Sequence, residues 1–124
     1  MSTIYLDIAQ TVSLVTRRGD TSKIKYIFKD SDGNAIDCTA YTFFMEVRTS
    51  AEDDVTPSTV VSLGNEAFLV ESTNNVTMTI ADDIMRNVPG ATYTYEIEAV
   101  KGGETQTWVR GTFYVREDVA IGDG

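Results

Sequence analysis

Apolar and polar residues alternate along most of this chain, a pattern typical of β-strands that bury one face. The first alternating run covers residues 3–16, where the even positions from Ile4 to Leu14 are apolar except at Gln10. We expect two strands here, broken near Gln10. In residues 23–29, lysines at 23, 25 and 29 alternate with an apolar set, which predicts a strand with one solvated face.

Turn-forming residues separate these runs. Residues 18–21 contain Gly-Asp and predict a turn. Residues 30–34 are Asp-Ser-Asp-Gly-Asn and predict the closure of a hairpin, because Asp and Asn side chains bond their own backbone and glycine permits positive φ. Residues 41–48 have the strongest strand pattern of the first half. Residues 49–59 lack apolar periodicity and hold three consecutive carboxylates and a proline, so we expect a mobile loop.

The second half continues the same pattern with one exception. Residues 60–63, 67–70 and 75–80 predict three short strands, and residues 93–115 predict a long hairpin that turns at Lys-Gly-Gly-Glu. The exception is a short helix near residues 82–88, because two aspartates stand at its positive N-terminal end and Pro-Gly follows it.

These elements add up to an all-β protein of about seven to nine antiparallel strands with turns every 8 to 12 residues or so, which favours an immunoglobulin-like β-sandwich. Composition supports this fold class, since Val and Ile number 22 and Thr 17, against 4 Leu. A chain of 124 residues fits one domain. We expect that domain to cover residues 1–119, with a C-terminal tail at residues 120–124.

Charge and the absence of histidine narrow the function classes. The chain has no histidine, which excludes hydrolases that use a Ser-His-Asp or Cys-His pair and zinc sites that use histidine ligands. The formal charge of −9 falls entirely within residues 51–124, so nucleic acid and anionic membranes are poor partners. No run of 18 apolar residues and no signal peptide is visible. The single Cys38 is expected to be a small buried side chain.

Two patterns resemble chemical sites and are interpreted otherwise. Asp30, Asp32 and Asn34 occupy alternate positions of a calcium loop, but the required later Gly and Glu are absent. Glu96 and Glu98 lie about 6–7 Å apart on one strand face, a spacing that glycosidases use, yet they belong to the solvated side of an amphipathic strand. We therefore predict no enzyme activity, no catalytic or metal-binding residues and no cofactor.

Apolar side chains at outward positions of the last strand are the main candidate for function. If Val109, Phe113 and Val115 face the core, alternate positions face solvent. The residues expected to point outward are Trp108, Arg110, Tyr114, Arg116 and, on an earlier strand, Phe44. Such residue types dominate protein interfaces, so they predict a docking patch. The alternatives are a β-bulge at Gly111 that reverses the register and carries Trp108 into the core, and a loop that covers Trp108.

Several segments together resemble the N-terminal sandwich domain of phage baseplate upper proteins and related tail and fibre proteins. They are Arg-Gly-Asp-Thr at 18–21, the Asp-Gly-Asn-Ala-Ile-Asp-Cys-Thr-Ala-Tyr-Thr segment at 32–42, Glu-Val-Arg at 46–48, and the later segments 89–90, 93–98 and 110–113. Ala35, Cys38 and Ala40 depart from the Pro, Leu and Gly usual in that group. The resemblance covers nearly the whole chain.

This resemblance implies a phage or prophage virion protein, made in the host bacterial cytoplasm, that docks other virion structural proteins, with self-association as a second mode of assembly. It would act as a tail or baseplate adaptor or a fibre base. Alternatives are a capsid decoration or head-fibre protein, and a carbohydrate- or cell-surface-binding module with Trp108 or Tyr114 as its platform. In the docking role, the acidic loop residues Glu52, Asp53 and Asp54 would match basic residues on the partner subunit.

Overall fold

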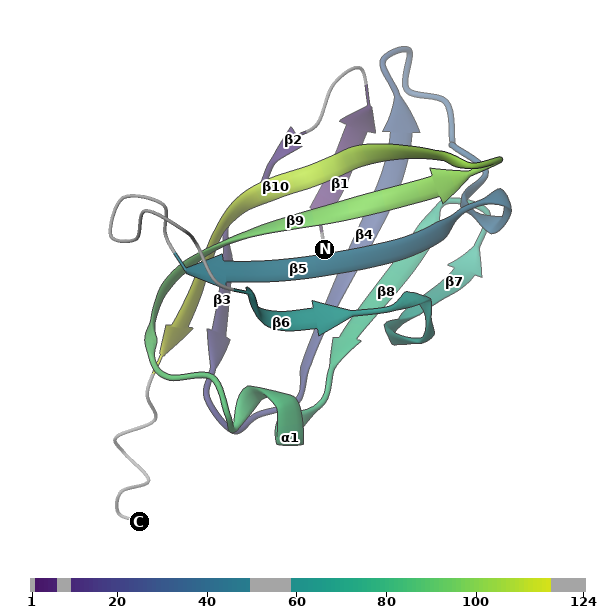
Figure 1. Ribbon diagram of the computed structural model, residues 1–124. Helices are drawn as coiled ribbons and strands as arrows, with labels where there is room; N and C mark the ends of the chain where they lie inside the picture. Colours follow the sequence, from purple (N-terminus) through teal and green to yellow (C-terminus); the bar gives the residue numbers. More distant parts are fainter. Residues whose placement is uncertain (1, 7–9, 50–58, 117–124) are drawn as a thin grey trace.

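The computed structural model of this protein describes residues 2–6, 10–49 and 59–116. Two β-sheets pack face to face in it (Figure 1). The four-stranded sheet has the order β1 (Ser2–Leu6), β4 (Ser22–Asp30), β8 (Asn75–Ile80), β7 (Phe68–Ser72). The six-stranded sheet has the order β2 (Gln10–Thr11), β10 (Glu104–Arg116), β9 (Ala91–Lys101), β5 (Thr42–Thr49), β6 (Thr59–Leu63), with β3 (Leu14–Arg17) beside β10. The all-β sandwich prediction is confirmed.

Three strand pairings are parallel, whereas an antiparallel arrangement was expected. β1 runs parallel to β4, and both β2 and β3 run parallel to β10. Parallel neighbours cannot be joined by a tight turn. Here β2 and β3 separate β1 from β4 along the chain, and β10 is the last strand (Figure 1). Alternation of apolar residues carries no information on strand direction, and assignment to the immunoglobulin class stays a prediction.

The first alternating run divides into three strands, one more than expected. β2 and β3 lie along the same edge of β10 and are separated by Val12 and Ser13. Val12 donates its N–H to the carbonyl of Arg110 at 2.8 Å, while its own carbonyl accepts a hydrogen bond from the hydroxyl of Tyr95. That carbonyl is thereby turned toward the interior, which interrupts the strand.

The predicted turn at residues 30–34 is present and closes on a carboxylate. Asp30 Oδ1 accepts hydrogen bonds from the backbone N–H groups of Asp32 and Asn34, both at 2.9 Å. Gly33 has φ +88°, which suits glycine. The strand after the turn is reduced to a single bridge between Lys29 and Ala35. Asp30, Asp32 and Asn34, the residues that resemble a calcium loop, therefore serve to close the turn.

Short helices connect the strands. Two 3-10 turns precede strands: η1 (Cys38–Ala40) comes before β5, and η2 (Asn65–Ala67) comes before β7. The helix α1 (Asp82–Met85) is shorter than the predicted 82–88. Beyond Met85 the backbone N–H groups of Asn87 and Val88 bond carbonyls three residues back, those of Ile84 and Met85, so the rest of the predicted helix forms tighter turns. No helix of the described ranges is long and apolar enough to span a membrane. The predicted loop at 49–59 falls almost wholly outside the described residues, as does the tail at 120–124, and the domain limits stay a prediction.

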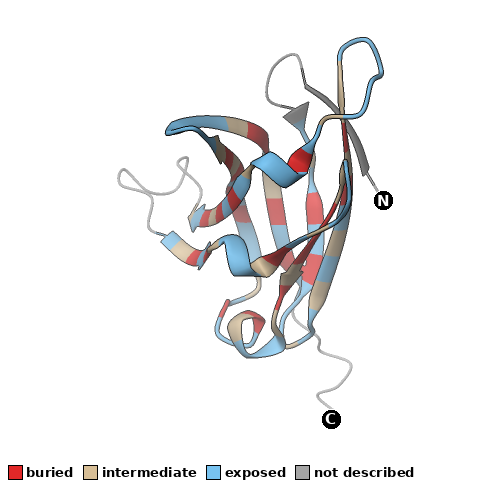
Figure 2. Ribbon diagram, turned by 90° about the vertical axis from the view of Figure 1, so that its right-hand side faces the viewer, coloured by how far each residue is buried: buried red, intermediate tan, exposed pale blue. Residues whose placement is uncertain are grey.

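The core lies between the sheets and follows the predicted alternation (Figure 2). On β9 the expected inward residues are all buried: Tyr93, Tyr95, Ile97 and Ala99. Cys38 is buried as expected. At one end of the sandwich the rings of Phe28, Tyr41, Phe43 and Trp108 pack against one another, with centroids 4.7 to 6.5 Å apart. This aromatic cluster joins both sheets.

Trp108 belongs to this core, so its predicted outward position is wrong. The register between β10 and β9 shifts between Thr107 and Val109, and this bulge leaves Trp108 and Val109 both facing inward. Trp108 is only 4% exposed. The alternative interpretation, a bulge that places Trp108 in the core, is confirmed, but the bulge is at Trp108 itself. Gly111 pairs in regular register with Tyr95.

Burial changes the acidity of three groups in the core. Burial raises the pKa of Tyr95 to about 12 and that of Cys38 to about 12, from ordinary values of 10.0 and 9.0. Burial also raises the pKa of Tyr26, and its interaction with Tyr95 raises it further. The Tyr26 hydroxyl makes no hydrogen bond of good geometry with the described residues. All three groups therefore keep their protons in the folded state at alkaline pH.

These raised pKa values predict a loss of stability at alkaline pH. The unfolded chain releases the Cys38 proton from pH 9.0 and the tyrosine protons from pH 10.0, while the folded chain retains them to about pH 12. The free energy of unfolding should therefore be unaffected by these groups below pH 9.0 and fall above it, by up to about 1.4 kcal/mol per pH unit for Tyr26. Urea unfolding across this range measures it. A Tyr26→Phe variant should show a shallower slope above pH 10.0, and an unchanged slope would contradict this origin.

Candidate functional site

The outer face of the six-stranded sheet carries four of the eight residues predicted to interact with partners. Arg110, Tyr114 and Arg116 on β10 and Phe44 on β5 are exposed, as expected. Tyr114 and Phe44 are 42% and 41% exposed, which is high for large apolar side chains. The remaining predicted contacts, Glu52, Asp53 and Asp54, lie outside the described residues.

Tyr114 has an exposed apolar neighbour that the sequence analysis missed. β3 and β10 pair in register, which places Val15 opposite Tyr114 and Arg17 opposite Arg116. Val15 is 62% exposed. We call Val15, Tyr114 and Arg116 the β3–β10 patch. The sequence did hold a signal for it, because Val15 is an apolar residue at an odd position of the first alternating run, where the other odd positions are mostly polar or small.

Phe44 does not belong to this patch. It pairs with Glu98 on β9, whereas Tyr114 pairs with Thr92 on the same strand. Those two β9 positions are six residues apart, which is about 20 Å of extended strand. The single docking patch expected from the sequence is therefore divided into two separate positions at opposite ends of the sheet face.

Charged residues cross the middle of this face on three neighbouring strands. Glu46 on β5 lies directly opposite Glu96 on β9, and Glu96 in turn lies opposite Arg110 on β10. Arg48 donates a hydrogen bond to Glu46 and forms an ion pair with it. Within the described residues, no ion pair joins Glu96 to Arg110. Two like charges placed directly across a strand pair are destabilising, so this row is an unusual feature of a solvated sheet face.

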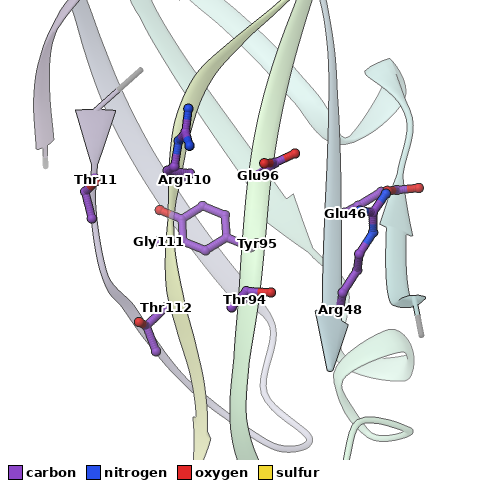
Figure 3. A pocket seen from close by; sticks show the side chains of 9 residues that line it. All are labelled: Thr11, Glu46, Arg48, Thr94, Tyr95, Glu96, Arg110, Gly111 and Thr112. Carbon is purple, nitrogen blue, oxygen red and sulfur yellow. The ribbon is translucent and has the colours of Figure 1, made fainter. Parts of the chain in front are cut away.

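A hollow of about 330 Å³ lies over this charged row (Figure 3). Its depth follows from residue size, because the outward-facing Thr94 and Thr112 are short, while longer Glu and Arg side chains stand around them. Gly111 contributes only its backbone to the hollow, because it pairs with the buried Tyr95 and its side-chain position faces away from the outer surface. Close packing requires glycine at this position, since a Cβ atom on it would lie 2.2 Å from the carbonyl oxygen of Val12. The hollow therefore has a floor of small residues and a charged rim.

The carboxylate pair considered in the sequence analysis divides between two surroundings. Glu96 is exposed and lines this hollow, whereas Glu98 is half-buried and does not. Both carboxylates line a much smaller depression beside Phe44 and Glu46. The carboxylate that faces Glu96 is Glu46 from the neighbouring strand. The arrangement provides hydrogen-bond acceptors and donors at one place on a rigid sheet, which is suited to binding.

Comparisons with known proteins found no matching family model and no matching curated protein. Among solved structures, the chain is similar to a predicted glycoside hydrolase from Bacteroides vulgatus (TM-score 0.48, 8% identity), of which it covers 16% while 84% of this chain is matched. It is also similar to an uncharacterized protein from Bacillus anthracis (TM-score 0.46, 10% identity, 88% of this chain and 86% of that one). A third is the N-terminal domain of phage TP901-1 ORF48 (TM-score 0.45, 13% identity, 94% and 99%). At these scores none assigns a family or a function.

Proposed function

We propose that this chain is a non-enzymatic structural subunit of a bacteriophage or prophage virion and that it docks other virion proteins through the β3–β10 patch. The ordered motifs that resemble the baseplate upper protein domain support the phage assignment. A tail or baseplate adaptor, or a fibre base, is the role that this resemblance favours. The chain lacks histidine, so an enzymatic mechanism would have to use a reactive cysteine thiolate or a carboxylate that acts as general acid or base. Cys38, the single cysteine, is buried with a raised pKa.

The observation that carries the docking proposal is the pair formed by Val15 and Tyr114. Two large apolar side chains, 62% and 42% exposed, lie side by side across neighbouring strands. Burying them against a partner would gain about 25 cal/mol for each Å² of apolar surface removed from water. Tyrosine and arginine are also the residue types that contribute most at interface centres, and Arg116 stands beside Tyr114 on the same face.

Charge favours a partner of opposite sign. The chain carries a net charge of −9, so like-charged copies repel one another at low salt. The preferred partner is therefore a different virion subunit of net positive charge, and self-association ranks second. Its surface opposite the patch should be apolar, with acidic or uncharged residues facing Arg17 and Arg116. Association should slow as salt is raised, because steering between opposite charges is screened.

Loss of the patch should weaken assembly without unfolding the protein. The chain is co-expressed with the proteins of neighbouring genes, and the complex is measured by size-exclusion chromatography with light scattering. Tyr114→Ser and Val15→Thr should each weaken the complex at least about fivefold, since truncation of an interface anchor costs more than about 1 kcal/mol. The melting temperature should stay close to that of the wild type, because both side chains are exposed.

Leu69 supplies the matched control. It is 60% exposed on β7 of the opposite sheet, so Leu69→Ser removes a similar apolar surface from the other face. The Leu69→Ser variant should assemble like the wild type. A complex that survives both patch substitutions, or that is lost equally with Leu69→Ser, would refute docking through the β3–β10 patch.

A further inference from the structure

We propose that the hollow over Glu46, Glu96 and Arg110 binds a neutral saccharide. The hollow adjoins the β3–β10 patch, because Thr112 at its edge is two residues before Tyr114 on β10, but it shares no residue with the patch. The proposal goes beyond the proposed assembly role. The hollow lies over β5, β9 and β10 at the middle of the six-stranded sheet (Figure 3). Val15 lies on β3 and pairs with Tyr114, four residues further along β10 than Arg110.

The hydrogen-bonding groups of the hollow define the chemistry of the ligand. Carboxylates only accept hydrogen bonds and guanidinium groups only donate them. Arg48 is engaged with Glu46, whereas Glu96 and Arg110 form no ion pair with each other in the described part of the chain. A ligand that satisfies both must donate to Glu96 and accept from Arg110. A hydroxyl group does both, and Thr94 and Thr112 on the floor can also donate and accept.

The balance of charge around the hollow favours a neutral ligand over a metal cation or a phosphate. Its rim holds two carboxylates, Glu46 and Glu96, and two guanidinium groups, Arg48 and Arg110, so its formal charge sums to zero. A metal cation would be repelled by the arginines, and a phosphate by the glutamates. A neutral molecule with several hydroxyl groups meets neither penalty, and neighbouring hydroxyls on a sugar ring match the paired atoms of carboxylate and guanidinium groups.

Size and rigidity fit the same class of ligand. The volume of about 330 Å³ is at the lower end of the range for small-molecule sites, about 300 to 1,000 Å³. The lining residues stand on paired strands, and Gly111 is fixed against Val12, so binding requires no rearrangement of the backbone. The hollow is open to water and lacks an exposed aromatic ring among its lining residues, so affinity should be about millimolar.

Titration of the ¹⁵N-labelled full chain with glucose, galactose, mannose, rhamnose and N-acetylglucosamine, followed by NMR, tests the proposal. At least one sugar should give saturable shift changes centred on the amides of Thr94, Gly111 and Thr112. Glu96→Ala and Arg110→Ala should each weaken binding about tenfold. Glu104→Ala, which removes an exposed carboxylate at the β9–β10 turn, should leave it unchanged.

Each other outcome overturns the proposal. No saturable change with any of the five sugars, changes centred elsewhere, or equal affinity in Glu96→Ala and the wild type would do so. Shift changes in the hollow that occur only with a co-expressed protein partner would assign it to protein contacts instead. Tyr114→Ser separates the two hypotheses, because it should abolish docking to a partner while leaving sugar binding intact.

Discussion

Replacing Trp108 with alanine is expected to lower the free energy of unfolding by about 3–5 kcal/mol. The indole is 4% exposed, and its ring centroid lies 5.0 Å from that of Phe28, 4.7 Å from Tyr41 and 5.5 Å from Phe43. Removing it would leave a cavity between the sheets that this aromatic cluster cannot fill. Equilibrium unfolding in urea, monitored by far-UV circular dichroism, measures the change.

Phe44→Ala is the control for this substitution. Phe44 is an aromatic residue on the outer face and is 41% exposed, so its removal should change stability by less than about 1 kcal/mol. If Trp108→Ala were as stable as Phe44→Ala, Trp108 would lie on the surface, and the bulge between Thr107 and Val109 would not exist in solution.

The second large effect is expected from Gly111→Ala, which should destabilise the protein by about 2–4 kcal/mol. The added Cβ atom would lie 2.2 Å from the carbonyl oxygen and 2.8 Å from the carbonyl carbon of Val12, which are backbone atoms that cannot rotate away. Relief requires separation of β10 from the segment between β2 and β3. That separation would also weaken the hydrogen bonds that Val12 makes with Arg110 and Tyr95.

Gly33 provides the comparison for Gly111. A Cβ atom on Gly33 would meet nothing within 4 Å, so Gly33→Ala measures only the strain of its φ of +88°. That strain should amount to about 1–2 kcal/mol. Thermal and urea unfolding of the two variants should place Gly111→Ala clearly below Gly33→Ala. The reverse order would show that β10 and Val12 do not approach each other as closely as described.

Residue periodicity was sufficient to predict the sandwich because burial of one face imposes a period of two on each strand. The inward set on β9 is an example, since every second residue from Tyr93 to Ala99 is buried. Direction and order of strands leave no such mark. The parallel pairing of β1 with β4 depends on where the chain crosses between sheets, which no local pattern records.

Trp108 shows why the candidate site was only partly predictable. A single inserted residue in β10 reverses the parity on one side of the bulge, so Trp108 was placed outward while Arg110 and Tyr114 were placed correctly. The bulge favours burial of the largest side chain of the strand. From sequence alone the two registers differ by one residue and cannot be separated by alternation.

The hollow could not have been foreseen because it depends on cross-strand register. Glu46 and Glu96 are fifty positions apart in the chain, and only the pairing of β5 with β9 places them opposite each other. The same is true of Val15 and Tyr114, which meet through the parallel pairing of β3 with β10. A sequence can indicate which residues face outward, but the neighbours of each residue on that face follow from strand order.

The central claim is that the protein works by binding through the β3–β10 patch, and hydroxyl-radical footprinting of the chain, free and in complex with its co-expressed partner, tests it most directly. Tyr114 and Leu69 are both exposed in the free chain, on opposite sheets. Assembly should reduce the oxidation of Tyr114 several-fold and leave that of Leu69 unchanged. Equal oxidation of Tyr114 in the free and assembled states, or protection of Leu69 alone, would contradict the account.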